Sequence, residues 1–303
     1  MSLYHLLDPF WSRFPWPKTM GVGVDEMAGV QRIRLVCRYF GSETMPVYCY
    51  AVGDTLVDSG MPFSAPRLVK LAEEMGLRRA FITHHHEDHS GGAAALAAAG
   101  ADVVTTPMTA RLLAHDMPLP FYQQMVWGRT RPVTLRVIEG DTVRVGPHEA
   151  RIVAAPGHAV DQVVLHVPER GWLFSADVFI HERVKIFRRD EDFAASVVTL
   201  ERLLELDFDT LFCGHRPVAE GGKEALARKL AWLRELEEGA RHHHAQGRDI
   251  GEIVRRLGIA NRNAMVLLAM GDASPANLVR SILHGPTTRR EVSRALATPS
   301  SDS

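Results

Sequence analysis

The sequence has few cysteines and no excess of charge of either sign. Its three cysteines, Cys37, Cys49 and Cys213, are odd in number and form no CxxC pair, so neither a disulfide framework nor a thiolate zinc site is expected. The formal net charge of −1 and the isoelectric point of about 7.0 exclude the global positive field of a dedicated nucleic-acid-binding protein. This composition favours a protein of the reducing cytoplasm.

The sequence also lacks long apolar runs. No segment offers the roughly 20 apolar residues that a membrane-spanning helix needs, so we expect no membrane partner. The first 20 residues are interrupted by Pro9, Pro15 and Pro17 and have no basic start, unlike a signal peptide. We expect this aromatic leader, residues 1–20, to pack on the body of the protein or on a second copy of the chain, which would make the protein a homodimer.

The hydrophobic content of 46% and the charged content of 23% in 303 residues are typical of a globular protein with one large domain and a smaller appendage. Beyond the leader, we predict a main catalytic domain over residues 21–220 and a helical C-terminal extension over residues 221–297. The last residues, 298–303, are expected to be disordered.

Short β-rich runs alternate with helix-like runs from residue 33 to residue 215, which indicates an α/β domain. The predicted strands are 33–39, 47–52, 55–57, 80–83, 102–105, 133–137, 151–155, 163–167, 172–175 and 210–213; the predicted helices are 64–75, 90–99, 107–115 and 193–206. Residues 116–132 show no periodicity and are long enough for a functional loop, so we predict a wall of the substrate site there. After Pro217 only helices are expected. One carries Leu226, Leu230, Leu233 and Ala240 along an apolar face, and later ones cover residues 250–257, 263–269 and 275–283.

The run Thr83-His84-His85-His86-Glu87-Asp88-His89 directly follows a predicted apolar strand. We place His84, His86, Asp88 and His89 in one loop, from which several imidazole and carboxylate groups project into a crevice. Zinc favours such ligands. Taken alone, the run is also compatible with a solvated turn.

Three further residues of the same chemistry follow predicted strands. His158 comes after residues 151–155, Asp177 after residues 172–175, and His215 after residues 210–213. In α/β sheets, ligands bind beyond the ends of the strands. The recurrence therefore predicts that four strands deliver metal ligands to one sheet edge.

These motifs, in this order, resemble those of the metallo-β-lactamase superfamily, over about residues 33–216. The resemblance implies an αββα sandwich, so the fold class we expect is α/β, a four-layer αββα sandwich with a small helical C-terminal extension. Five segments of this sequence are similar, in order, to the five motifs of the family: Asp58 in Leu56-Val57-Asp58-Ser59-Gly60, His84-x-His86-x-Asp88-His89, His158 after Pro156-Gly157, Asp177, and His215 after Cys213-Gly214. One departure is Ala176, where the family has glycine before this aspartate.

The resemblance implies a two-metal centre. His84, His86 and His158 would hold one ion, Asp88, His89 and His215 the other, and Asp177 would bridge them. Two such ions, most simply zinc with manganese or iron as alternatives, lower the pKa of a bridging water and supply hydroxide at neutral pH. Asp58 would orient the ligand loop, and Asp88 is a candidate to orient the nucleophile.

Other notable residues receive less specific interpretations. His181 is a candidate proton donor, although a plain loop residue is the simpler interpretation. His85 and Glu87 are interpreted as spacers, and Cys213 as a small buried hydrophobe. His242, His243 and His244 are expected to lie at a solvated helix end, and the charged residues from Glu182 to Asp192 are expected to form a solvated loop.

The motifs give a mechanism and leave the substrate open. The leading hypothesis is a metal-dependent hydrolase of a small-molecule ester, thioester or lactone. A helical extension is shared by glyoxalase II thioesterases and by the branch that contains endoribonucleases, so the alternative is a phosphodiesterase or endoribonuclease. The extension lacks a dense basic face with interleaved aromatics, which disfavours nucleic acid as a partner. A third alternative is a mononuclear iron persulfide dioxygenase of the same fold.

Overall fold

The computed structural model describes residues 18–117, 119–184, 186–261, 266–267, 269 and 271–286. Most of the predicted leader and the whole predicted tail, 298–303, lie outside the described residues. The described chain forms two compact units that meet in sequence between Ile152 and Val153. This division into compact units does not test the domain boundary predicted near residue 220, which stays a prediction.

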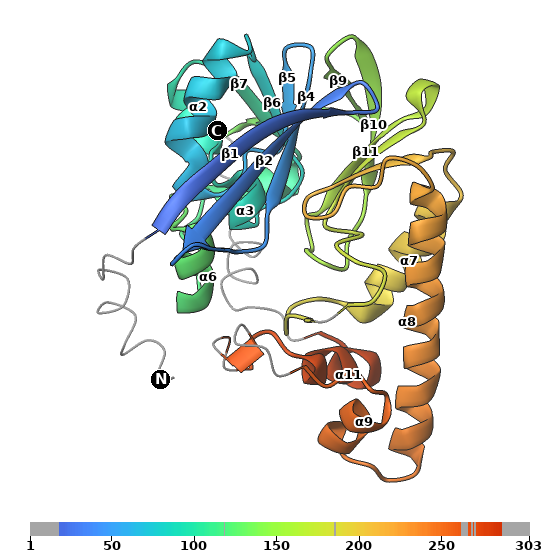
Figure 1. Ribbon diagram of the computed structural model, residues 1–303. Coiled ribbons are helices and arrows are strands. Elements are labelled where there is room, and N and C mark those ends of the chain that lie inside the picture. The colour runs from blue at the N-terminus through green and yellow to red at the C-terminus, as the bar shows by residue number, and fades with distance from the viewer. Residues whose placement is uncertain are drawn as a thin grey trace, which may run out of the picture. The chain divides into compact units, whose positions relative to one another are not determined.

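The first sheet contains eight strands among the described residues, in the order β1-β2-β4-β5-β6-β7-β8, with β3 paired to β2. It changes from antiparallel pairing at its β1 end to parallel pairing from β5 onward. Its strands are β1 (Lys18–Met27), β2 (Val30–Tyr39), β3 (Ser42–Glu43), β4 (Val47–Val52), β5 (Thr55–Val57), β6 (Arg79–Ile82), β7 (Asp102–Thr105) and β8 (Arg136–Val137). Figure 1 shows β1 and β2 as a long ribbon at one end of this sheet.

Helices connect the parallel strands of the first unit, because parallel neighbours need crossover connections. The helix between β5 and β6 buries Leu68 and Ala72 on its apolar face. The helical segments of this unit are η1 (Pro62–Ser64), α2 (Ala65–Glu74), α3 (Glu87–Ser90), α4 (Ala93–Ala98), α5 (Pro107–Leu113) and α6 (Phe121–Trp127).

The second sheet has five strands in the order β13-β12-β11-β10-β9. β12 and β13 run parallel, with Ala176 paired to Cys213 at their carboxyl ends. The strands are β9 (Thr142–Val145), β10 (His148–Ala154), β11 (Val163–Val167), β12 (Trp172–Ala176) and β13 (Thr210–Cys213), and the turn η2 (Pro168–Arg170) joins β11 to β12.

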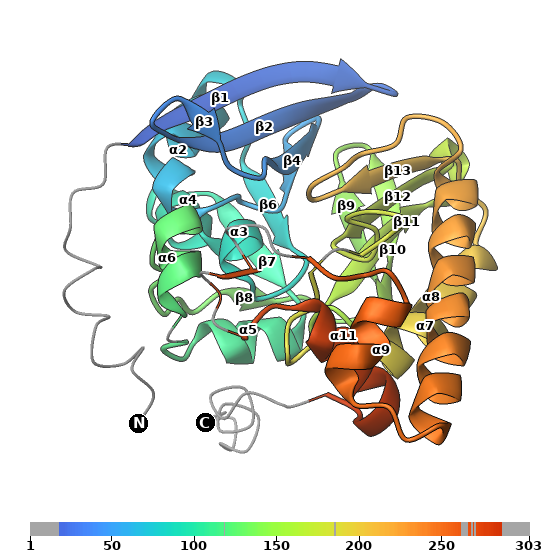
Figure 2. The same cartoon turned by 60° about the horizontal axis from the view of Figure 1, so that its bottom comes forward.

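The second unit is completed by helices α7 (Phe193–Leu204), α8 (Gly222–Ala245), α9 (Ile250–Arg256) and α11 (Pro275–His284). Three of them begin at N-cap residues, Asp192, Asp249 and Ser274. The side-chain oxygens of these caps accept hydrogen bonds from backbone N–H groups of the first turn, which have no partner within the helix. Figure 2 shows α9 and α11 beside the long helix α8. α8 buries the predicted apolar face of Leu226, Leu230, Leu233 and Ala240 in the hydrophobic core of this unit.

Several elements differ from the sequence prediction. Lys18–Met27 forms β1 although its residues are largely exposed, because it pairs with β2 over ten residues. The segment 116–132, predicted to be irregular, contains α6. The predicted helix 263–269 lies largely outside the described residues. Among the described helices, none combines the length and the apolar character required to cross a membrane.

Candidate metal centre

The histidine run begins where β6 ends. His84, His86, Asp88 and His89 are all buried, with exposed fractions of 6% or less. The prediction that these four residues share a loop is wrong for Asp88 and His89, which lie in the short helix α3. His86 is the extended residue that precedes this helix, so the chain turns sharply between the two ligand pairs.

Asp58 organises this run. Its Oδ1 accepts hydrogen bonds from the backbone N–H and the hydroxyl of Thr83, each at 2.9 Å. Its Oδ2 lies 2.7 Å from Nδ1 of His89. A proton on Nδ1 directed at this carboxylate leaves Nε2 of His89 as the nitrogen able to ligate a metal.

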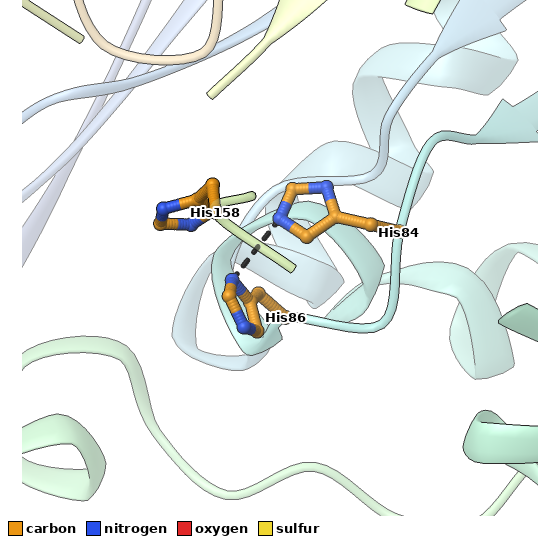
Figure 3. Close-up of side chains that lie close together, drawn as sticks. All are labelled: His84, His86 and His158. Carbon is orange, nitrogen blue, oxygen red and sulfur yellow. Dashed lines mark hydrogen bonds between the residues drawn. The ribbon is translucent and has the colours of Figure 1, made fainter. Parts of the chain in front are cut away.

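His84 and His86 direct ring nitrogens at one position. Nε2 of His84 lies 3.1 Å from Nδ1 of His86, drawn as the dashed line in Figure 3. The other ring nitrogen of His84, Nδ1, lies 3.1 Å from the Thr83 hydroxyl. The Thr83 hydroxyl thus contacts the ring nitrogen of His84 that is not directed at His86.

Asp177 and its two histidine neighbours form the corresponding cluster of the second unit. One oxygen of Asp177, Oδ2, lies 3.3 Å from Nε2 of His158 and 3.2 Å from Nε2 of His215. The parallel pairing of β12 and β13 brings Asp177 and His215 to the same sheet edge, and the N–H of Gly214 donates to the carbonyl of Ala176 at 2.9 Å. Ala176 adopts a φ of 44°, a left-handed conformation that glycine would adopt without strain.

The ligand set predicted from the sequence is divided between the two units. His84, His86, Asp88 and His89 lie in the first unit, and His158, Asp177 and His215 lie in the second. Each residue offers one nitrogen or carboxylate oxygen. Imidazole nitrogens and carboxylate oxygens are the donors that zinc and related ions prefer, so the residues fit a two-metal centre.

The match to known families covers these ligands. Residues 43–215 match the family described as the Metallo-beta-lactamase superfamily. The chain belongs to this superfamily. The match contains every predicted metal ligand, and the α/β fold with C-terminal helices is confirmed.

Solved metallo-β-lactamase structures show the same fold. A metallo-beta-lactamase from Pontibacter korlensis has a TM-score of 0.57 at 21% identity, over 71% of this chain and 99% of that one. A beta-lactamase domain protein from Burkholderia ambifaria has a TM-score of 0.59 at 20% identity, over 86% of this chain and 88% of that one.

Curated relatives match a shorter part of the chain. A hydroxyacylglutathione hydrolase from Cereibacter sphaeroides is 32% identical over 99 residues, which are 32% of this chain and 38% of that protein. A beta-lactamase-like protein 2 homolog from Drosophila melanogaster is 39% identical over 70 residues, 23% of each chain. The chain thus matches less than half the length of these curated relatives.

Two buried charged residues near the Asp177 cluster were missed by the sequence analysis. The expectation of a solvated loop from Glu182 to Asp192 is wrong for Arg188, Asp190 and Glu191, whose side chains are only 12%, 14% and 11% exposed. Glu191 contacts His158, with Oε2 3.4 Å from Nδ1. The alternating charges of this segment did not indicate that these side chains are buried, because the residues that cover the loop come from the distant C-terminal part of the chain.

Lys229 is the second missed residue. It lies on the buried face of α8, and its Nζ donates to the carbonyls of Val178 and Phe179 at 2.6 and 2.8 Å. Burial lowers the pKa of Lys229 to about 8, although the nearby charge of Glu191 opposes this shift. The ammonium group ties α8 to the two residues that follow Asp177.

The remaining residues singled out in the sequence occupy simple positions. His181 is half-buried, and its Nδ1 accepts a hydrogen bond from the N–H of Arg183 at 3.1 Å. His242 and His244 are exposed near the end of α8, as expected. Cys213 is fully buried, as expected for a small hydrophobe, and this burial raises the pKa of its thiol.

Proposed function

We propose that the protein is a dinuclear metal hydrolase that cleaves an ester, thioester or lactone of a small molecule. The observation that carries this proposal is the set of seven candidate ligands, four that follow β6 in the first unit and three that follow strands in the second. A centre for one zinc ion would need only three or four of them. The match to the metallo-β-lactamase superfamily over residues 43–215 supports the same conclusion.

In the proposed ligand sets, His84, His86 and His158 would hold one ion, and Asp88, His89 and His215 would hold the other. Asp177 would bridge the ions. Its position supports this role, because the Nε2 atoms of His158 and His215 approach the same carboxylate oxygen at 3.3 and 3.2 Å.

Two bound divalent cations would lower the pKa of a water between them and supply hydroxide near neutral pH. The protein's own residues orient this chemistry. Asp58 holds His89 in the tautomer that ligates, and Asp88 is placed in the proposed site to orient the attacking water. His181 is the proposed proton donor. Its Nδ1 accepts from the N–H of Arg183, so Nε2 is the ring nitrogen through which a proton would pass to a leaving group.

A thioester is the first substrate to test. The hydroxyacylglutathione hydrolases that match the chain are named for the acyl derivative of glutathione, a thioester. Their match covers only about a third of this chain, so the substrate is part of the proposal. The segment 116–132, with α6, is the proposed wall of the substrate site.

Zinc is the proposed metal, because the seven candidate ligands are five histidines and two aspartates. The cytoplasm is the proposed compartment, supported by Cys37, Cys49 and Cys213, which are all buried free thiols. The helical extension over residues 221–297 and a homodimer formed with the leader remain predictions.

The test combines metal analysis with a panel of substrates: a hydroxyacylglutathione thioester, a lactone, a phosphodiester and RNA. The proposal expects two metals per chain and hydrolysis of the thioester or the lactone. His84→Ala and Asp177→Ala should abolish hydrolysis with the fold retained, while His242→Ala on the exposed end of α8 should act as wild type. Preferred cleavage of RNA or the phosphodiester would select the nuclease alternative, and one iron per chain with oxygen consumption on a glutathione persulfide would select the dioxygenase.

A further inference from the structure

The ring of His158 lies between two carboxylates of the second unit. Its Nε2 is 3.3 Å from Oδ2 of Asp177, and its Nδ1 is 3.4 Å from Oε2 of Glu191. The side chains of His158 and Glu191 are both 11% exposed, and that of Asp177 is 3% exposed. The two edges of the imidazole therefore face different acidic partners in a largely dry environment.

We propose that Glu191 is a positioning residue for His158 and that the C-terminal segment 271–284 holds Glu191 in place. A carboxylate that faces Nδ1 at 3.4 Å attracts the ring proton to that nitrogen and favours the lone pair on Nε2, where it can bind a metal. Histidine ligands commonly donate their second N–H to such an outer carboxylate, which fixes both the tautomer and the ring orientation. This inference rests on the proposed role of His158 as a metal ligand.

The loop that carries Glu191 is fixed at several points close to the side chain. Oε1 of Glu191 accepts from the backbone N–H of Arg188 at 2.9 Å. This leaves Oε2 to face His158. The next residue, Asp192, donates its backbone N–H to the carbonyl of Gly157 at 2.7 Å, so the loop is bound directly to the residue that precedes His158.

The C-terminal helix α11 supplies a further attachment through Ser281, which is 6% exposed. The hydroxyl of Ser281 donates to the carbonyl of Glu191 at 3.1 Å and accepts from the backbone N–H of Phe193 at 3.0 Å. One hydroxyl thus pairs the polar backbone groups on both sides of Asp192. Removing it would leave a buried carbonyl and a buried N–H without this partner, which destabilises the loop in its present position.

The start of the same segment holds the other end of the loop. The carbonyl of Phe187 accepts from the backbone N–H of Ser274 at 2.9 Å and from Nδ2 of Asn277 at 3.2 Å. The N–H of Arg189 donates to the carbonyl of Asp272 at 2.9 Å. Residues 272–281 therefore form hydrogen bonds with the loop from Phe187 to Phe193 on both sides of Glu191. Figure 2 labels α11, which contains part of this segment.

This arrangement gives the C-terminal helices a specific role at the metal site. The contacts run from α11 to the loop, from the loop to Glu191, and from Glu191 to Nδ1 of His158. The extension supports a ligand from outside the metal shell. This role is independent of whether the extension also contacts substrate.

The decisive variant is Glu191→Gln, which keeps the size of the side chain and its acceptor for Arg188. The expected result is a 10- to 100-fold weaker affinity for zinc in a chelator competition, as for other outer-shell partners of metal-binding histidines. In the metal-free protein, where Asp177 competes for the proton at Nε2, nitrogen NMR of the histidine rings should show a larger share of the Nδ1–H form of His158 in wild type than in the variant. Glu201→Gln, which alters a surface ion pair with Arg234, is the matched control and should leave both measurements unchanged.

A second variant, Ser281→Ala, tests the link to α11. It should weaken zinc binding in the same direction, and the double variant with Glu191→Gln should bind zinc no more weakly than Glu191→Gln alone, because Ser281 acts through Glu191. His158→Ala distinguishes the positioning role of Glu191 from the ligand role of His158. If it loses zinc while Glu191→Gln and Ser281→Ala bind as wild type, the positioning role is wrong and the ligand assignment stands; if His158→Ala binds zinc as wild type, the proposed metal centre itself is wrong.

Discussion

The carboxylate of Asp58 lies 2.7 Å from Nδ1 of His89, and both side chains are almost fully buried. The same carboxylate accepts from the backbone and the hydroxyl of Thr83. These contacts connect the residue after β5, the residue after β6 and the helix α3. Asp58 therefore couples the orientation of a ligand to the ends of two strands of the first sheet.

Asp58→Asn should weaken zinc binding by about 10- to 100-fold. Asparagine fits the same space and tolerates the φ of 62° at this position, but its neutral amide is a weaker partner for the His89 ring than a carboxylate. Chelator competition measures the change, and circular dichroism checks that the fold is retained. Wild-type affinity in the folded variant would contradict the role of Asp58.

Gly157→Ala should reduce both stability and zinc affinity. Gly157 has a φ of 138°, and a Cβ there would lie 2.7 Å from both Cα and N of Ser196, so α7 or the chain next to His158 must move. We expect a loss of at least about 1–3 kcal/mol in the free energy of unfolding, measured by urea denaturation.

Gly100→Ala is the control for the backbone conformation. Gly100 also has a positive φ, 93°, but a Cβ there would meet no atom within 4 Å. It should cost about 1–2 kcal/mol from its φ alone and leave zinc affinity unchanged. Equal zinc affinity in both variants would show that the approach of Gly157 to Ser196 does not position His158.

Lys229 predicts a pH dependence of stability in the metal-free protein. Its pKa is lowered to about 8 by burial, against 10.5 for an ordinary lysine. Between these values the unfolded chain keeps a proton that the folded chain releases, so the free energy of unfolding rises with pH, by about 3 kcal/mol in all. Below about pH 8 both states are protonated, and this contribution no longer changes.

Lys229→Met removes this titration. The difference in the free energy of unfolding between wild type and the variant, measured from pH 7 to pH 10.5, should therefore move in favour of wild type as the pH rises. Groups that titrate in both proteins cancel in this comparison. A difference that stays constant over the range would contradict the lowered pKa of Lys229.

Metal removal should lower the melting temperature. A ligand that binds only the folded state stabilises it by about 3 kcal/mol at a hundred times its dissociation constant. Addition of zinc to the metal-free protein should therefore restore the melting temperature in wild type and should restore much less of it in His84→Ala. Identical melting curves with and without zinc would argue against a metal site in the folded protein.

The sequence was sufficient to select the seven candidate ligands because their segments each follow a strand, and strand ends in α/β folds are where ligands gather; that these residues bind metal stays a prediction. It also predicted the buried face of α8 from its helical spacing. The buried charged residues around the predicted ligands could not be found in this way. Glu191 and Lys229 look like surface charges in sequence, and only the folding of residues 271–284 and of α8 around them reveals that they are buried.

Local patterns also failed where pairing or short helices decided the structure. Lys18–Met27 is mostly exposed and carries little apolar periodicity, so its ladder with β2 could not be predicted from its own residues. Asp88 and His89 lie in a helix of only four residues, which is shorter than any reliable periodic signal.

The rate of hydrolysis of a hydroxyacylglutathione thioester, measured while zinc is titrated into the metal-free protein, tests the central claim most directly. A dinuclear hydrolase predicts no activity without metal, a rise that is complete at two equivalents per chain, and no activity at any zinc concentration in Asp177→Ala. Activity that is complete at one equivalent, or that persists in Asp177→Ala, would contradict the two-metal centre bridged by this aspartate.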